Sequence, residues 1–255
     1  MTYSSRHPQF FYTTAPLPCP YLPERMERKV VTDLAGADAE GLHERLSRSG
    51  FRRSHTIAYA PVCNGCNACI PIRIPVMRFL PSRTQRRIMK ANATIEGFEM
   101  PARATAEQFI LFHQYQMARH AEGDMAGMSF TDYRSMVEDT PIETNIIEFR
   151  TQNDQLTGVS LVDRLGDGLS AVYSFFDPTM DARSPGTFAV MWLIERARAR
   201  NLPYVYLGYW IAESRKMAYK SNFRPAEILF RGMWRDLDAA KALPGMPLKE
   251  EPAAS

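Results

Sequence analysis

The chain has 255 residues, of which 45% are hydrophobic and 23% are charged, a composition typical of folded proteins and unlike that of disordered ones. No run approaches the roughly 18 apolar residues that a membrane span needs, and the first residues lack the apolar segment of a signal peptide. The sequence therefore predicts a cytoplasmic protein of two packed lobes, with no membrane partner.

The net charge of +3 conceals an uneven distribution of basic residues. Residues 45–95 contain ten arginines and lysines and no Asp or Glu. A field of one sign over one part of a molecule favours a polyanionic partner, and nucleic acid is the commonest polyanion in the cytosol. A solvated basic surface is the alternative, although such surfaces usually carry interspersed acids.

The first predicted lobe, residues 1–98, has few regular elements. Five prolines among residues 1–24 predict irregular backbone, and the pattern at 38–49 predicts a helix. Strands are predicted over 51–60 and 70–76. Prolines at both ends of the second strand predict that it lies at a sheet edge or a bulge.

Cysteines dominate the loop between these two strands. Cys63, Cys66 and Cys69 form two C-x-x-C spacings that share their middle residue, and Cys19 lies far upstream. Four thiolates at such spacings suit zinc or an iron–sulfur cluster, and in a reducing compartment they suit metal or redox work better than disulfides. The spacing leaves open whether they hold a metal.

A basic helix is predicted next, beginning after Ser82 as its cap and carrying Arg83, Arg86 and Arg87. The free backbone N–H groups of its first turn lie beside these guanidinium groups. The combination suits a phosphate ligand.

The second predicted domain, residues 99–240, is of the α+β class, and a flexible tail over 241–255 follows it. Helices are predicted at 105–121, 130–137, 186–200 and 214–221, and strands at 144–151, 157–164, 169–176, 204–210 and 226–232. This order resembles a GNAT-type acyltransferase core, which carries the smaller, basic, cysteine-containing lobe at its N-terminus. In that fold two neighbouring parallel strands separate and leave unpaired backbone groups facing a ligand, and here they would be 170–176 and 204–210.

The segment Asp181-Ala-Arg-Ser-Pro-Gly-Thr-Phe188 bears on the acyl donor. Acetyl-CoA-using members of the fold carry two glycines in the loop that holds the pyrophosphate, whereas this segment has only one. We therefore expect that coenzyme A is not the donor.

Several segments resemble, in order, the motifs of the aminoacyl-tRNA–protein transferases (R-transferases) of the N-degron pathway. They are Tyr59–Arg73, Ser82–Arg87, Tyr115–Met125, Ser170–Pro178, Tyr204–Ile211, Lys216–Lys220 and Phe223–Pro225. The similarity covers roughly residues 10 to 235 and is strongest to the bacterial aspartate/glutamate leucyltransferase branch. It implies an N-end rule enzyme that transfers leucine from Leu-tRNA to the α-amino group of proteins beginning with Asp or Glu, marking them for degradation.

Two alternatives remain open at this point. One is an arginyl-tRNA–protein transferase with the same acceptors, and the other is a non-catalytic, metal-stabilised nucleic-acid-binding module. In longer eukaryotic relatives, cysteines similar to Cys19, Cys63, Cys66 and Cys69 are reported to hold an iron–sulfur cluster, which the resemblance makes conceivable here.

The chemistry implied by the resemblance needs no cofactor, because the donor is an ester and is already activated. An attacking amine needs deprotonation, orientation and stabilisation of oxyanion charge. His120 and Asp177 are the candidate bases, and Tyr173 with Phe175 on one strand and Gly208 with Tyr209 on the other would orient the acyl group and the amine.

The remaining candidates would bind the two substrates. Basic groups and a helix start would hold tRNA phosphates, and these are Arg83, Arg86, Arg87, Gly186, Thr187, Lys216 and Lys220. Tyr219 would stack on a terminal base. Arg78, Arg83 and Arg119 are the candidates for the carboxylate of an acidic N-terminal residue.

Overall fold

The computed structural model describes residues 8–247 and is of the α+β class, as the sequence predicts. An eight-stranded sheet runs through the molecule in the order β14-β13-β7-β12-β11-β10-β9-β8. Its strands are β7 (Ile70–Pro75), β8 (Ile95–Pro101), β9 (Thr144–Thr151), β10 (Leu156–Leu165), β11 (Gly168–Phe176), β12 (Tyr204–Trp210), β13 (Glu227–Phe230) and β14 (Met233–Asp236). No helix within residues 8–247 is both long and apolar enough to cross a membrane.

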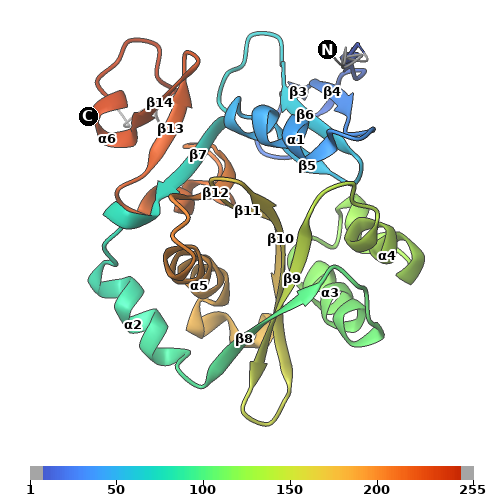
Figure 1. Cartoon of the computed structure of the whole chain (residues 1–255), viewed down its shortest axis with the longest axis vertical. Coiled ribbons are helices and arrows are strands. Elements are labelled where there is room, and N and C mark those ends of the chain that lie inside the picture. Colours follow the sequence, from blue (N-terminus) through green and yellow to red (C-terminus); the bar gives the residue numbers. More distant parts are fainter. Residues whose placement is uncertain (1–7, 248–255) are drawn as a thin grey trace, which may run out of the picture.

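Helices cover both faces of this sheet (Figure 1). They are α2 (Arg83–Ala91) and α5 (Pro185–Ala199) on one face, α3 (Ala106–Arg119) and α4 (Phe130–Glu138) on the other, and the short α6 (Leu237–Ala240) beside β13. Each face has its own apolar core. One is built around α5, and the other is an aromatic cluster that includes Phe112, Tyr133 and Phe175.

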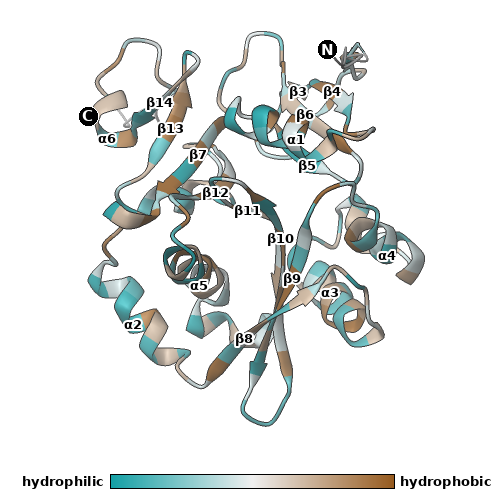
Figure 2. Ribbon diagram, viewed as in Figure 1, coloured by the Kyte–Doolittle hydropathy of each residue, from teal (hydrophilic) through white to brown (hydrophobic). Residues whose placement is uncertain are grey.

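Three helix starts follow directly from the sequence. Ser82, Thr105 and Ser129 each accept a hydrogen bond from the third helical residue, which bonds back to the cap in turn. Figure 2 shows α2 as a mostly hydrophilic ribbon, in keeping with a helix that lies on the outside of the molecule.

The N-terminal segment forms a smaller sheet in the order β1-β4-β6-β5, with α1 (Ala39–Arg48) packed against it. The strands are β1 (Tyr12–Thr13), β4 (Lys29–Asp33), β5 (Arg52–Ser54) and β6 (Ile57–Pro61), and β2 (Leu17–Pro18) pairs with β3 (Met26–Glu27) in a separate ribbon. The strand predicted over 51–60 is therefore a hairpin. It turns at His55, whose φ of 51° lies in the left-handed region.

The position of β7 corrects the predicted sheet edge. This strand lies inside the large sheet, paired with β12 along its length and with β13 at Ile72 and Arg73. Pro71 and Pro75 flank the two residues that pair with β13, so the missing N–H groups interrupt little of the ladder. The register with β12 shifts between Tyr206 and Gly208, so a bulge does lie beside this strand, but its extra residue is Leu207 of β12 and both prolines are paired outside it.

The boundary expected near residue 98 falls inside β8, and β7 from the first segment is paired with β12 from the second. The large sheet is thus continuous across that position. Two elements near the C-terminus also differ from expectation. Residues 226–232 belong to the β13–β14 hairpin, and the helix predicted at 214–221 is reduced to a 3-10 turn, η4 (Ala218–Asn222).

The tail predicted over 241–255 lies only partly within the described residues. Leu243 and Met246 pack against the core around α5, which shows that the first part of this segment is anchored. Residues 248–255 lie outside the described range.

Candidate active site

The parallel strands β11 and β12 separate as the sequence predicts. They pair only from Gly168 opposite Tyr204 to Ser170 opposite Tyr206. Beyond that point β11 continues along β10 and β12 continues along β7, so the facing edges of the two strands lose their ladder. This divergence leaves backbone groups free on each side of a gap.

Arg52 from β5 enters this gap. Its Nη1 donates to Ser170 Oγ at 3.1 Å, and its Nη2 donates to the carbonyl oxygen of Ala171. Gly208, with a φ of 77°, lies against the same guanidinium group, and a Cβ there would come within 2.9 Å of Arg52 Nε. Glycine is therefore required both by the backbone conformation and by the close approach of Arg52.

No carboxylate within residues 8–247 pairs with Arg52, which is half-buried. The sequence reasoning did not single out this residue. Its only sequence signal was membership of the acid-free segment, because its partners lie more than a hundred positions away.

A second group gathers where α3 ends, beside the 3-10 helix η3 (Pro178–Arg183). His120 Nδ1 lies 3.4 Å from Lys216 Nζ, and the imidazole packs against the ring of Tyr115 with centroids 5.7 Å apart. Burial, together with the positive charges of Lys216 and Arg119, lowers the pKa of His120. Its imidazole is consequently neutral near pH 7 and able to accept a proton.

The other two predicted catalytic residues have structural partners. Asp177 caps η3, accepting from Thr179 N at 2.8 Å and from Thr179 Oγ1 at 2.6 Å, as a turn-initiating aspartate does. Tyr173 lies in the aromatic cluster on the α3 face, where its hydroxyl accepts from Gln116 at 2.6 Å. Burial raises the pKa of Tyr173, so its hydroxyl stays protonated near neutral pH.

The start of α5 adjoins the group around His120. Phe176, at the end of β11, packs on Tyr115 with ring centroids 4.9 Å apart, and a Cβ on Gly186 would lie 3.3 Å from the Phe176 ring. No side chain caps α5, and Thr187 in its first turn is half-buried. Pro185 has no N–H, and the N–H groups of Thr187 and Phe188 both donate to the carbonyl oxygen of Ser184 at 3.0 Å. This leaves the Gly186 N–H at this helix start and takes Thr187 out of the predicted phosphate site.

Lys216 and Lys220 do not share an exposed helical face, contrary to the prediction. Lys216 is exposed beside His120, whereas Lys220 is buried and donates to the carbonyl oxygen of Tyr209 at 2.8 Å. Burial, aided by the charge of Arg52, lowers the pKa of Lys220 to about 7. The prediction failed because the helix it assumed over both lysines is a short 3-10 turn that begins after Lys216.

The other predicted binding residues are distributed around the molecule. Tyr219 is 40% exposed and its ring packs edge-on against Phe223 with centroids 6.4 Å apart, whereas the Tyr209 hydroxyl donates to the carbonyl oxygen of Gly50 at 3.0 Å inside the protein. Phe175 is buried between the sheet and α3.

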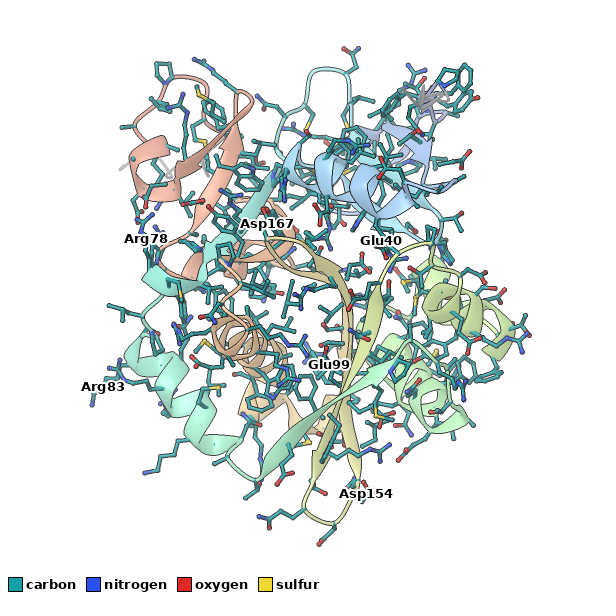
Figure 3. The ribbon with its side chains drawn as sticks, viewed as in Figure 1. Glu40, Arg78, Arg83, Glu99, Asp154 and Asp167 are labelled. Atoms are coloured by element: carbon teal, nitrogen blue, oxygen red, sulfur yellow. The ribbon has the colours of Figure 1, made fainter. Side chains whose placement is uncertain are left out.

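The predicted cations differ in how they are paired. Arg78 pairs with Glu227 and Asp236, and Arg119 pairs with Asp181. Arg83, Arg86 and Arg87 are exposed on α2 and make no ion pair within residues 8–247, and Figure 3 shows Arg83 projecting away from the body of the molecule.

The four cysteines lie near one another and form no disulfide. Cys19, Cys66 and Cys69 pack around Leu22 and Ile211, while Cys63 Sγ accepts from the backbone N–H of Arg28 at 3.4 Å. Burial and the three other thiols raise the pKa of Cys69 to about 12. Among the described residues no group of three or more His, Cys, Asp or Glu side chains is arranged to hold a metal ion.

Comparison with known proteins covers nearly the whole chain. Residues 17–87 match the family model "Arginine-tRNA-protein transferase, N terminus", and residues 107–230 match the corresponding C-terminal model. An aspartate/glutamate leucyltransferase of Gluconacetobacter diazotrophicus is 70% identical over 93% of this chain and 92% of its own length. An aspartate/glutamate leucyltransferase of Granulibacter bethesdensis is 64% identical over 91% of this chain and 87% of its own length.

Among solved structures, a GCN5-related glucosamine N-acetyltransferase region of a fungal protein aligns with a TM-score of 0.38 and 11% identity, over 68% of this chain and 20% of that one. The match to both family models, and identity of this extent to full-length relatives, show that the chain belongs to the aminoacyl-tRNA–protein transferase family.

Proposed function

We propose that this aminoacyltransferase moves leucine from Leu-tRNA to the α-amino group of proteins that begin with Asp or Glu, in the cytoplasm. The observation that carries the proposal is identity of 70% and 64%, over more than nine-tenths of the chain, to relatives named for this activity. A non-catalytic nucleic-acid-binding module is excluded by membership of an enzyme family.

In the proposed reaction the acceptor nitrogen attacks the carbonyl carbon of the leucyl ester. The new C–N bond forms as the C–O bond to the terminal ribose breaks. The neutral imidazole of His120 takes the proton from the amine and returns it to the departing ribose hydroxyl. The lowered pKa of His120 supports this role, because a protonated imidazole cannot accept a proton.

The tRNA would be held by phosphate contacts on two elements. Arg83, Arg86 and Arg87 are exposed on α2 and free of ion pairs within the described residues, and Gly186 at the uncapped start of α5 supplies a backbone donor. Tyr219 would stack on a terminal base, and Lys216 would stand near the reacting ester. The segment 181–188 around the start of α5 has the single glycine Gly186, so coenzyme A has no role in this proposal.

For the acidic acceptor side chain we propose Arg52 in place of the ion-paired Arg78 and Arg119. Its guanidinium group lies in the gap between β11 and β12 and has no carboxylate partner within residues 8–247. Transfer from an ester needs no cofactor. Zinc or an iron–sulfur cluster at the cysteines would be an accessory to the N-terminal segment, with no step of the reaction passing through it.

The proposal is tested with labelled leucine supplied as Leu-tRNA and with peptides that begin with Asp, Glu or Ala. Label on the Asp and Glu peptides alone is expected. Label on the Ala peptide, or none on any peptide, would contradict the assignment. Parallel assays with Arg-tRNA and Phe-tRNA test the alternative that the donor amino acid is arginine, the amino acid in the description of the matching family model.

A further inference from the structure

Lys220 is a buried cation whose hydrogen-bonding capacity is only partly used. The residue is 8% exposed, and its Nζ donates to the carbonyl oxygen of Tyr209 at 2.8 Å. An ammonium group has three donors, and within residues 8–247 the other two have no protein partner. No Asp or Glu of that range forms an ion pair with Lys220 either. A buried charge in this state costs free energy unless an anion pairs with it.

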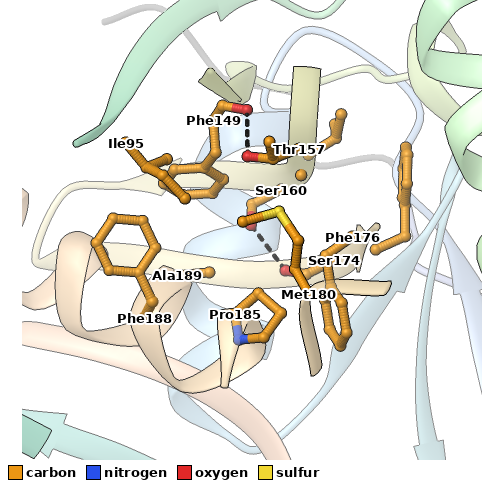
Figure 4. A pocket seen from close by; sticks show the side chains of 13 residues that line it. Ile95, Phe149, Thr157, Ser160, Ser174, Phe176, Met180, Pro185, Phe188 and Ala189 are labelled. Atoms are coloured by element: carbon orange, nitrogen blue, oxygen red, sulfur yellow. Dashed lines mark hydrogen bonds between the residues drawn. The ribbon is translucent and has the colours of Figure 1, made fainter. Parts of the chain in front are cut away.

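Polar side chains in the interior of the large sheet are, by contrast, paired with groups of the protein. Between the sheet and the first turn of α5, Thr157 Oγ1 donates to the carbonyl oxygen of Phe149 at 2.9 Å. In the same region the hydroxyls of Ser160 and Ser174 are 2.8 Å apart (Figure 4). The free donors of Lys220 therefore indicate a ligand that the described part of the chain does not supply.

Arg52 lies near Lys220, close enough for its charge to lower the pKa of the amine, and it also has no carboxylate partner within the described residues. Cys69 is the other titratable group that acts on Lys220, and burial raises the pKa of Cys69 to about 12, so that it is a neutral thiol. Glu27 on β3 pairs with Lys29 at 2.8 Å. Two cations are thus held near each other without an acid between them, an arrangement that a bound anion would stabilise.

Two tyrosine hydroxyls extend this group of polar side chains. Tyr21 lies near both Tyr59 and Arg52, and neither tyrosine hydroxyl makes a hydrogen bond within residues 8–247. Burial and the neighbouring Tyr59 raise the pKa of Tyr21 to about 12, so its hydroxyl stays protonated and can donate to an anion. All three side chains are only half-buried, which leaves the group open to solvent on this side.

Tyr219, which precedes Lys220 in η4, connects this group to the proposed reaction centre. Burial and the neighbouring Tyr115 raise the pKa of Tyr219 to about 12, and Tyr115 packs against His120 with ring centroids 5.7 Å apart. Successive residues of η4 therefore lie beside the proposed base and beside Arg52. The α-amine and the side-chain carboxylate of an N-terminal Asp or Glu are likewise only a few bonds apart.

We infer that Lys220 is the second cation of the acceptor site and that, together with Arg52, it binds the side-chain carboxylate of an N-terminal Asp or Glu. The inference rests on the proposed function, which supplies the acidic acceptor. A carboxylate at the end of an extended chain can enter a deep site, whereas a phosphate flanked by two nucleosides reaches only exposed groups such as those on α2. An uncharged Asn or Gln is rejected because it would leave the buried cations without an anion.

The test compares peptides that begin with Asp or with its uncharged isostere Asn, using Leu-tRNA as the donor. For the unchanged protein, kcat/KM for the Asp peptide is expected to exceed that for the Asn peptide by at least about 100-fold. Lys220→Met removes the charge while keeping much of the side-chain volume. It should lower kcat/KM for the Asp peptide about 100-fold and change the value for the Asn peptide less than about threefold. An equal loss for both peptides would indicate a structural role and overturn the inference, as would an unchanged ratio.

A second substitution separates the charge of Lys220 from its bond to Tyr209. Lys220→Gln keeps a donor for the carbonyl oxygen of Tyr209 but carries no charge, so it should reduce the preference for Asp over Asn as Lys220→Met does. A normal preference in Lys220→Gln would show that the charge is not what selects the acceptor. Lys241→Met is the matched control, because Lys241 is exposed and pairs with Asp238 at 3.2 Å. It should alter none of these values, and thermal melting checks that every variant is folded.

Binding measured without transfer distinguishes failure of this inference from failure of the proposed function. Fluorescence anisotropy with labelled Asp and Asn peptides, and separately with uncharged tRNA, needs no donor amino acid. Weaker binding of the Asp peptide to Lys220→Met, with unchanged affinity for tRNA, supports the site even if leucine is not transferred. Loss of tRNA affinity with unchanged peptide binding would assign the two cations to a phosphate and overturn the inference. Failure of the unchanged protein to distinguish the Asp peptide from the Asn peptide would overturn it as well.

Discussion

Two sets of basic residues share the acid-free segment 45–95, and the structure gives them opposite environments. In the first set, Arg53 and Arg73 are buried, and Arg45, Arg48 and Arg78 also form ion pairs. In the second, Arg83, Arg86, Arg87 and Lys90 are exposed on α2 and have no acidic partner within residues 8–247. Arg52 belongs to neither set, because it is half-buried and bonded to Ser170 and Ala171 between β11 and β12. The α2 set is the exposed and unpaired one that a polyanion can reach.

The difference arises from long-range pairing that no local pattern reveals. Arg53 donates two hydrogen bonds to Asp163, at 2.7 and 2.8 Å, from 110 positions away. Arg73 pairs with Glu227 at 2.8 Å and stacks between the rings of Tyr204 and Trp234, 3.6 and 4.2 Å from their centroids. Charges counted along the sequence of residues 45–95 therefore overestimate the positive electrostatic field of this segment in the folded protein.

The largest expected effect comes from breaking the buried set at Arg53. Arg53→Met leaves the carboxylate of Asp163 buried without its cation, which should lower the free energy of unfolding by about 3–5 kcal/mol in urea denaturation at pH 7. Arg53→Met with Asp163→Leu should recover most of that loss, because the remaining charge is removed as well. A loss below about 1 kcal/mol in the single variant would mean that Asp163 finds another partner.

The pH dependence of stability that arises from His43 tests the same buried network of Arg53 and Asp163. Its Nε2 lies 3.7 Å from Asp163, yet burial lowers the pKa of His43 to about 4, since Arg53 already neutralises that carboxylate. The unfolded chain binds a proton near pH 6.5 and the folded protein does not. The contribution of His43 to stability should therefore be complete above pH 6.5, be lost as the pH drops to about 4 and change no further below that, with a total of about 3 kcal/mol.

The check is urea denaturation at several pH values between 7 and 4 for His43→Gln, which should remove most of that slope. His113→Gln, on the exposed side of α3, is the control and should retain it. A slope that survives in His43→Gln would assign the acid sensitivity to carboxylates instead.

Hydrophobic periodicity predicted the strands and the helix whose order along the chain defines the fold. The strands β9, β10, β11 and β12 and the helix α5 lie within about one residue of their predicted bounds. Their patterns were readable because hydrophobic spacing and turn residues agree along each segment. The separation of β11 from β12 followed from this order together with the family resemblance.

Other features depended on contacts that the sequence does not display. The edge strand β8 was missed because its exposed hydrophobic and acidic residues give no continuous apolar face. Arg52 could not be located because its partners Ser170 and Ala171 are joined to it only in three dimensions.

The smallest effect on stability is expected from substituting the exposed arginines of α2, in contrast to the large loss expected for Arg53→Met. Reversing Arg83, Arg86 and Arg87 to Glu should change the free energy of unfolding by only about 0.5 kcal/mol, because these side chains are exposed and unpaired within the described residues. Affinity for tRNA should instead fall, and the slope of log affinity against log salt should lose about 2 to 3 units if all three groups contact phosphates. Filter binding over a range of salt concentrations measures both quantities.

Arg78→Glu is the matched control, since Arg78 is 58% exposed but already pairs with Glu227 and Asp236. It should leave the salt slope unchanged. If Arg78→Glu weakens tRNA binding as much as the triple variant does, tRNA responds to the overall charge of segment 45–95. Whether an arginine is ion-paired would then not determine where nucleic acid binds. A normal salt slope in the triple variant would remove α2 from the interface, and the remaining basic surface would have to be sought near Lys216 and the start of α5.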